Sequence, residues 1–207
     1  MIIDESSKVI FLHNPKCGGS FFRNLCSQNG LKTSEIYWDY HSEETDADLA
    51  YISLINLPRF VPDYQEYKII AFVRNPYNRF ASGIKEVKIA PGNAELKKVL
   101  ELCGNDIKKF CSHLLNLSYH EQDQILRNPA IPWLMPQSCF TDKTTITLRY
   151  ESLVDWQFLF NVFNIPEANV RIGEDYALDD ETKRMIRELY FEDEDIFCLY
   201  DKNKLSL

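Results

Sequence analysis

The stretch that decides the fold runs from Val9 to Ser20 and reads VIFLHNPKCGGS. Its first four residues are all apolar, which predicts a buried β-strand. Gly18 and Gly19 allow a tight turn, and Ser20 begins a predicted helix over residues 20–29. Free amide groups and the helix dipole then face the loop, where Lys16 adds a positive charge. The sequence therefore predicts a phosphate or sulfate site here, with a solvated lysine beside a structural turn as the plainer alternative.

A second stretch, from Lys68 to Gly83, repeats this layout and reads KIIAFVRNPYNRFASG. Its first six residues are too apolar to alternate, so they predict a central parallel strand that is covered on both faces. Arg74 lies at the carboxyl end of this strand, and Ser82 follows on a helix that Pro76 begins. A guanidinium and a hydroxyl can therefore converge on a second anion, whereas helix capping and surface pairing are the alternative.

Two anion sites imply a ligand with phosphates at two places. A nucleotide loop of the Walker A type requires Gly-x-x-x-x-Gly-Lys-Ser/Thr, whereas Lys16 precedes the glycines here, so an ordinary ATPase fits poorly. No acidic pair stands where a kinase would hold magnesium, and we therefore expect activity without a metal.

Length and composition bound the class of protein. The chain has 207 residues, of which 45% are hydrophobic and 13% aromatic, which is enough for one well-filled domain and short for two. We expect a single domain over residues 1–207. No run of about 18 apolar residues and no signal pattern occurs, so we expect a cytoplasmic chain without stable membrane insertion.

Charge and cysteine usage exclude further classes. The net charge of −8 argues against sequence-independent nucleic-acid binding, which needs a positive face that releases counterions. It also argues mildly against a long polyanionic acceptor. The six cysteines include no Cys-x-x-Cys pair, so reduced thiols are expected.

Strand and helix patterns alternate along the chain, which predicts a three-layer α/β/α fold with a mostly parallel central sheet. The predicted strands lie near residues 8–12, 33–38, 68–73 and 145–150. The predicted helices lie near residues 20–29, 46–56, 76–87, 94–127, 156–163 and 180–190. We expect interruptions near Gly104 and Ser118, and we expect the helix over 156–163 to be buried because it is apolar around most of its circumference.

The chain resembles the carbohydrate sulfotransferases, the Golgi-type family (sulfotransferase family 2-like) that uses 3′-phosphoadenosine 5′-phosphosulfate (PAPS). Residues 15–20 are similar to that family's 5′-phosphosulfate loop, and residues 73–82 are similar to its 3′-phosphate segment. Three further segments resemble later elements of the family in the same order, namely residues 133–139, 149–153 and 190–200.

The resemblance implies a P-loop NTPase-like sulfotransferase fold and transfer of a sulfuryl group from PAPS to a hydroxyl acceptor, with a sugar as the expected acceptor. Lys16 would steady the leaving phosphate and is thus a catalytic candidate. The residues expected to bind the nucleotide donor are Pro15, Lys16, Cys17, Gly18, Gly19, Ser20, Phe21, Arg74 and Ser82.

His41 is the residue that we expect to act as general base. It follows the predicted second strand, at the edge where parallel α/β sheets open their ligand crevice. In the resembled family, a histidine at a similar point often takes this part. A solvated loop histidine is the alternative, and Glu43 and Glu44 are spare candidates for the base. His13 is expected to brace the donor loop.

The remaining candidates each have two interpretations. Trp133 and Gln137 either shape the acceptor or adenosine pocket or form a packed corner, and Pro132 stands where the family commonly has histidine. Glu151 either orients basic side chains or forms a structural ion pair. Cys17 is either a nucleophile or a small loop residue.

Two rival functions stay open at the level of the sequence. The first is a nucleotide-dependent phosphoryl-transfer enzyme of kinase-like chemistry. The second is a catalytically inactive nucleotide-binding module of the same fold. Acceptor identity and oligomeric state are also open, because the residues that would face an acceptor fall in a helical region whose spacing carries no chemical signal.

Overall fold

The computed structural model describes residues 1–31, 35–36, 41–42, 47–89, 94–173 and 175–201. The chain divides into two units, each assembled from two segments. Unit 1 comprises Met1–Arg74 and Gln137–Gly173, and unit 2 comprises Asn75–Pro136 and Glu174–Leu207. The chain therefore passes between the units after Arg74, Pro136 and Gly173. The expected single domain stays a prediction.

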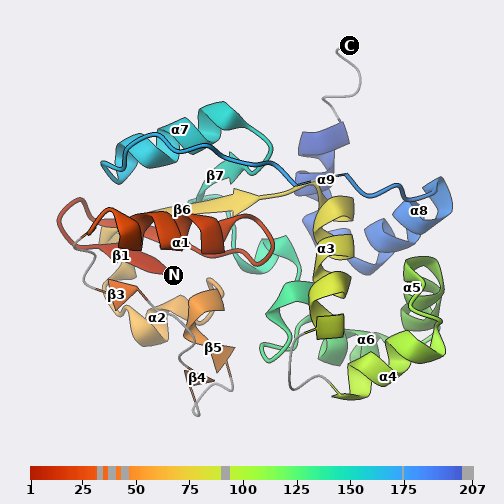
Figure 1. The fold of residues 1–207 in the computed structure, drawn as a ribbon. Coiled ribbons are helices and arrows are strands. Elements are labelled where there is room, and N and C mark those ends of the chain that lie inside the picture. Colours follow the sequence, from red (N-terminus) through yellow and green to blue (C-terminus); the bar gives the residue numbers. More distant parts are fainter. Residues whose placement is uncertain (32–34, 37–40, 43–46, 90–93, 174, 202–207) are drawn as a thin grey trace. The chain divides into compact units, whose positions relative to one another are not determined.

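Unit 1 is built on a sheet whose strands follow the order β3-β1-β2-β6-β7 (Figure 1). The bounds of these strands are Ile2–Asp4 for β1, Val9–Leu12 for β2, Glu35–Ile36 for β3, Lys68–Val73 for β6 and Ile146–Arg149 for β7. Strands β2, β6 and β7 are parallel, whereas β1 is antiparallel to both β2 and β3. The parallel strands at 9–12, 68–73 and 146–149 confirm the predicted α/β fold.

The two faces of this sheet carry separate apolar layers, as the alternation of side chains along a strand requires. Val9 and Phe11 of β2 pack in one layer, and Ile10 and Leu12 pack in the other. Helices cover both layers: α1 (Gly19–Gln28) and α7 (Leu153–Val162) lie on the first, and α2 (Leu57–Phe60) lies on the second. The predicted three-layer arrangement is therefore confirmed within unit 1.

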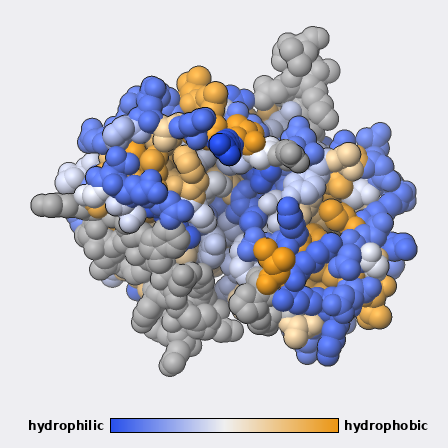
Figure 2. Space-filling model, in the orientation of Figure 1, coloured by the Kyte–Doolittle hydropathy of each residue, from blue (hydrophilic) through white to orange (hydrophobic). Residues whose placement is uncertain are grey.

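Trp156 of α7 lies at the centre of the first layer. The centroid of its ring lies 4.2 Å from the ring centroid of Phe72 and 6.0 Å from that of Phe160. Its Nε1 donates a hydrogen bond to the carbonyl of Tyr150 at 2.8 Å. The outer side of α7 is different, because Leu153 and Val154 are 62% and 78% exposed. Figure 2 shows hydrophobic residues at the surface in this region. The prediction that the helix over 156–163 is buried is confirmed for the side that packs on the sheet, which carries Trp156 and Phe160, whereas Phe158 on the other side is 42% exposed.

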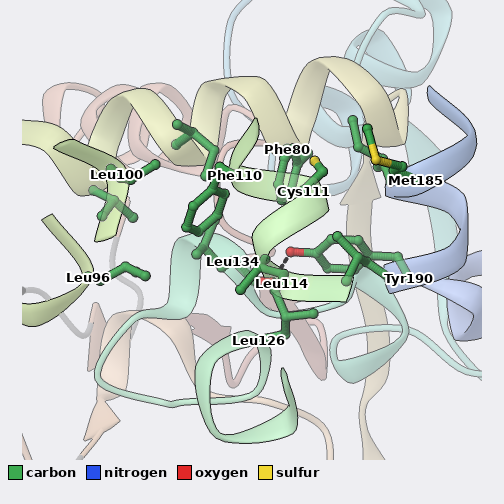
Figure 3. Close-up of a cluster of buried hydrophobic side chains, with 14 of the residues drawn as sticks. Phe80, Leu96, Leu100, Phe110, Cys111, Leu114, Leu126, Leu134, Met185 and Tyr190 are labelled. Carbon is green, nitrogen blue, oxygen red and sulfur yellow. Dashed lines mark hydrogen bonds between the residues drawn. The ribbon is translucent and has the colours of Figure 1, made fainter. Parts of the chain in front are cut away.

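Unit 2 is helical in the part that the structure describes. Its α-helices are α3 (Pro76–Ile89), α4 (Ala94–Leu102), α5 (Ile107–Leu115), α6 (Tyr119–Leu126), α8 (Asp180–Leu189) and α9 (Glu194–Asp201). Their apolar sides meet in one core around Phe80, Phe110 and Met185 (Figure 3). The hydroxyl of Tyr190 in this core donates to the carbonyl of Leu134 at 2.6 Å.

The interruptions predicted near Gly104 and Ser118 are both present. Gly104 has a φ of +66°, in the left-handed region that ends helices, and it follows α4. Ser118 caps α6 by accepting from the backbone of Glu121, whose carboxylate in turn accepts from the backbone of Ser118. This reciprocal capping box explains why the helical pattern restarts at Tyr119.

The helix predicted over residues 46–56 was wrong. Residues Ala47–Asp48 form a short strand, β5, that pairs with β4 (His41–Ser42), and a single 3-10 turn follows at Leu49–Tyr51. The buried residues that follow this turn pack on the second face of the sheet, which overrides the local helical pattern. Strand β1 was not predicted, because three residues are too few to show a period.

Shorter 3-10 helices complete the described chain at Tyr64–Glu66 (η2), Pro132–Leu134 (η3), Gln137–Cys139 (η4) and Phe191–Asp193 (η5). Among the helices that the structure describes, none combines the length and the apolar character that crossing a membrane requires.

Replacing Phe72 with alanine should lower the free energy of unfolding by about 3–5 kcal/mol, because a fully buried ring that contacts Phe11 and Trp156 is lost. The Phe158→Ala variant removes the same side chain from a position that is 42% exposed and should cost less than about 1 kcal/mol. Urea denaturation followed by circular dichroism measures both. Equal losses in the two variants would contradict the assigned layer.

Candidate active site

The loop between β2 and α1 has a backbone shaped by two left-handed residues. Lys16 has a φ of +64° and Gly18 a φ of +83°. Gly18 is the N-cap of α1 and supplies no side-chain cap, so the first amide groups of the helix are directed into the loop. A left-handed lysine costs about 1–2 kcal/mol relative to a glycine, and such strain persists where the surroundings fix it.

Both glycines of the loop are required by close packing. A side chain at Gly18 would lie 2.8 Å from the ring of Trp156 and 3.0 Å from that of Tyr150. A side chain at Gly19 would overlap the ring of His13. The loop is therefore pressed between the aromatic layer of α7 on one side and His13 on the other.

His13 is a structural residue in this arrangement. It is buried, and its ring centroid lies 4.6 Å from that of Tyr51. Burial, together with the charges of Arg23 and Lys16, holds the pKa of His13 well below its usual range, so the ring is neutral at neutral pH. Protonation thus favours the unfolded chain, and the stability due to a neutral His13 decreases as the pH falls below about 6.5. His13 braces the loop, as expected.

Gln137 ties the carboxyl ends of the parallel strands together. Its Oε1 accepts from the backbone amide of Arg74 at 2.9 Å, and its Nε2 donates to the carbonyl of Arg74 at 2.9 Å. The side-chain amide of Asn14 donates to the same Oε1 at 3.1 Å and to the carbonyl of Phe72 at 2.9 Å. Gln137 is fully buried, so this side chain holds Arg74 in place and does not face a substrate.

Arg74 is brought into contact with the donor loop. Its Nη1 donates to the carbonyl of Lys16 at 3.2 Å, and its guanidinium lies 4.8 Å from the ring centroid of Tyr150. The hydroxyl of Tyr150 accepts from the amide of Gly173 at 2.9 Å, which fixes the last residue of unit 1 beside the guanidinium. In the part of the chain that the structure describes, no carboxylate pairs with Arg74 and its Nε has no hydrogen-bond partner.

The other residues of the predicted donor loop occupy distinct positions. Pro15 and Cys17 are buried, and the Sγ of Cys17 lies 3.5 Å from both the carbonyl of Pro15 and the Oε1 of Gln137. This contact favours the interpretation of Cys17 as a small loop residue. Ser20 is exposed in the first turn of α1, and the ring of Phe21 meets Trp156 edge to face at 5.6 Å.

The remaining candidates lie on other elements of the chain. Ser82 is half-buried on α3 of unit 2, so its part in the site stays a prediction. The backbone of Trp133, also in unit 2, packs against Gly83, as a packed corner does. Glu151 is half-buried directly after β7.

His41 lies in β4, where it pairs with Asp48. Strand β3 runs in the same direction as β2, so the chain leaves β3 at the edge of the sheet where Lys16 follows β2. The side chain of His41 lies outside the described residues, as do Glu43 and Glu44. The assignment of the general base stays a prediction.

Several supporting residues were not found from the sequence. Asn14 directly precedes the loop, and its place between a buried strand and Pro15 was a usable signal, because a buried amide needs partners. Tyr150 lies in the segment 149–153 that resembles the family, but no local pattern indicated its contact with Arg74, and Gly173 gave no signal. Their importance comes from a stacking contact and a hydrogen bond between segments that are distant in sequence.

Comparison with known proteins agrees with this geometry. The model of the sulfotransferase family, of the carbohydrate sulfotransferase-like type, matches residues 1–201. The chain therefore belongs to the sulfotransferase family, which is a family of enzymes that transfer a sulfuryl group from PAPS. Searches of curated proteins and of solved structures returned no match. The resemblance noted from the sequence is confirmed.

Replacing Gln137 with leucine should lower the free energy of unfolding by roughly 2–4 kcal/mol, since each buried polar group left unpaired costs about 1–3 kcal/mol. The groups concerned are the backbone of Arg74 and the amide of Asn14. The side-chain amide of Gln157 donates to the exposed Asn161. The Gln157→Leu variant should therefore change the free energy of unfolding by less than about 0.5 kcal/mol. Urea denaturation compares the two, and similar losses would show that Gln137 does not anchor the strand ends.

Proposed function

We propose that this enzyme transfers the sulfuryl group of PAPS to a hydroxyl group of a carbohydrate. The observation that supports the proposal is the hydrogen bond of 3.2 Å between the guanidinium of Arg74 and the carbonyl of Lys16. It places two cationic residues together where the adjacent parallel strands β2 and β6 end. Ligands of open α/β sheets bind at this edge, and a donor with phosphates at two places needs two cationic groups.

The residues of the loop fit the 5′-phosphosulfate end of this donor. Two left-handed residues and an uncapped helix start direct backbone amides toward one point, and Lys16 and Ser20 add an ammonium and a hydroxyl. Pro15, Cys17, Gly18, Gly19 and Phe21 would shape this cradle. A bulkier loop would not fit, because side chains at either glycine meet aromatic rings.

Arg74 fits the 3′-phosphate end. Its guanidinium is nearly buried and stacked on Tyr150, yet in the described chain its Nε lacks a partner and no carboxylate neutralises it. Such a group is prepared to bind an anion, because it has already been desolvated on folding and its charge still lacks a counter-charge. Ser82, eight residues further on α3, is proposed to add a hydroxyl.

The mechanism relies on placement and charge. The donor supplies an activated sulfuryl group attached to a phosphate that can leave. Lys16 and the amides of the loop stabilise the negative charge that develops on the leaving phosphate. His41 accepts the proton of the acceptor hydroxyl as its oxygen bonds to sulfur and the bond between sulfur and the leaving oxygen breaks. Holding both reactants in line supplies much of the remaining acceleration.

We also propose that the reaction needs no metal ion. The sequence supports this proposal because no acidic pair stands where a magnesium ion would be held. Within the described residues, no group of three His, Cys, Asp or Glu side chains is placed to bind a metal ion. The charge that a metal would supply is instead supplied by Lys16 and Arg74.

The Lys16→Ala variant should lower turnover at least about 100-fold, because the leaving phosphate loses the ammonium group that the loop supplies. Release of the adenosine bisphosphate from PAPS, with a panel of mono- and oligosaccharides as acceptors, measures this loss. The exposed Lys98→Ala variant is the matched control and should keep full activity. Turnover that requires ATP and added magnesium would instead identify a phosphoryl-transfer enzyme.

The His41→Ala variant should keep its affinity for the adenosine bisphosphate and lose most of its turnover. In the unchanged enzyme, the rate should fall at acidic pH, because a protonated imidazole cannot accept the hydroxyl proton. Isothermal titration and the pH profile of turnover measure the two effects. If Glu43→Gln or Glu44→Gln removes the pH dependence and His41→Ala does not, the base is a carboxylate. Bisphosphate binding without turnover in the unchanged protein would indicate an inactive module.

A further inference from the structure

A pocket of mixed polar and apolar lining opens in unit 1 at the end of the sheet opposite to the one where Lys16 and Arg74 lie. It has a volume of about 370 Å³, within the range of roughly 300–1,000 Å³ that ligand sites occupy. Strands β6 and β7 begin side by side here, since Ile70 pairs with Ile146, and Ile69 lines the pocket between them. Ile69 lies five residues before Arg74 along the extended strand, a separation of about 17 Å, so the pocket is remote from the candidate active site.

One wall of the pocket carries a carboxylate with an unused oxygen. The Oδ1 of Asp142 accepts four hydrogen bonds, from the amide and hydroxyl of Thr144 at 2.8 Å each and from those of Thr145 at 3.0 Å each. The Oδ2 has no hydrogen bond within the described chain. Burial alone would raise the pKa of Asp142, but these bonds outweigh it and lower the pKa, so the group is ionised and fixed in orientation.

The facing wall carries aromatic and amide groups. Tyr64 and Gln65 of η2 line the pocket with Tyr67, and in the described structure neither the Tyr64 hydroxyl nor the Gln65 amide has a hydrogen-bond partner. Tyr67 is already engaged, since its hydroxyl donates to Glu5 at 2.5 Å and the ammonium of Lys8 lies 4.5 Å from its ring centroid. The pocket therefore combines apolar ring surface with donors and acceptors that the protein does not use.

The charges around the pocket select the class of ligand. The carboxylate of Asp142 disfavours a phosphate or sulfate, and one carboxylate is too few for a metal site. The ammonium of Lys8 already lies over the ring of Tyr67, and its positive charge disfavours the binding of an organic cation to this ring. A neutral ligand with both apolar faces and several hydroxyl groups meets the remaining requirements.

We propose that this pocket binds a saccharide, at a site separate from that of sulfuryl transfer. The sugar presents a C–H face to Tyr64, and its hydroxyl groups donate to the Oδ2 of Asp142 and exchange hydrogen bonds with the amide of Gln65. The walls are held in position, because the amide of Leu54, another lining residue, donates to the carbonyl of Cys139 at 2.9 Å. This binding does not depend on the proposed reaction.

The test is a titration of the full chain with cellotriose, lactose and chitotriose, followed by isothermal titration calorimetry and by NMR shifts of the backbone amides. We expect saturable binding of at least one sugar, with shifts at residues 64–67 and 142–145. Asp142→Asn should weaken it at least about tenfold, since a hydrogen bond to a charged group is worth about 1.5–3 kcal/mol. This substitution removes the charge and keeps an accepting oxygen for the turn. Tyr64→Ala should also weaken it, since the ring that packs on the sugar is removed. Glu101→Gln in unit 2 is the control and should bind as the unchanged chain does.

The proposal would be overturned if none of the three sugars bound saturably, or if both Tyr64→Ala and Asp142→Asn left the binding unchanged. Choline is titrated in parallel, and binding of choline in preference to the sugars would also overturn it. The sugar and donor sites are separable in the same samples, because Lys16→Ala should keep sugar binding and Asp142→Asn should keep affinity for the adenosine bisphosphate. Sugar binding without sulfuryl transfer would contradict the proposed function and support this pocket.

Discussion

The candidate active site depends on the pairing of one buried side-chain amide with the backbone of Arg74. The Oε1 of Gln137 accepts from the N–H of Arg74, and its Nε2 donates to the C=O of Arg74, as the backbone of a neighbouring strand would. The same Oε1 also accepts from the side-chain amide of Asn14. Strand β6 ends at Val73, so without this pairing the polar backbone of Arg74 would be buried and unsatisfied. The two loops that carry Lys16 and Arg74 are thus fixed through a single side chain.

The same constraint explains why the loop can hold strained backbone. Gly18 packs on Trp156 and Tyr150, and Gly19 packs on His13, so the turn has no room to relax. Lys16 is held in a left-handed conformation between these contacts, and its carbonyl accepts from Arg74. Strain of this kind is stable only where the surrounding packing over-determines it, and a prearranged set of donors is what a reaction based on charge and placement requires.

Local sequence patterns predicted the elements whose conformation is set by residues that are adjacent in the sequence. The strand at 9–12, the left-handed glycine turn and the helix after Pro76 each follow from neighbouring residues, and all were predicted. The pairing of Gln137 with Arg74 joins residues 63 positions apart, and no periodic pattern encodes it. The region after Ala47 has a helical pattern, yet it forms a short strand and a 3-10 turn, and Ile52 after this turn packs on the sheet. The outer side of α7 is exposed because no further layer covers it, and the number of layers in a fold is not encoded in the local pattern of one helix.

The distribution of charge gives the two edges of the sheet different chemistry. The chain carries a net charge of −8, yet Lys16 and Arg74 converge where β2 and β6 end, without a described carboxylate on Arg74. At the opposite edge, Asp142 is ionised and Lys8 is neutralised by contacts with Glu5 and Glu66. An anionic donor is therefore attracted to the carboxyl edge and repelled from the amino edge, because both fields act over about a Debye length of 10 Å. A neutral ligand feels neither field, so only shape and hydrogen bonding decide where it binds.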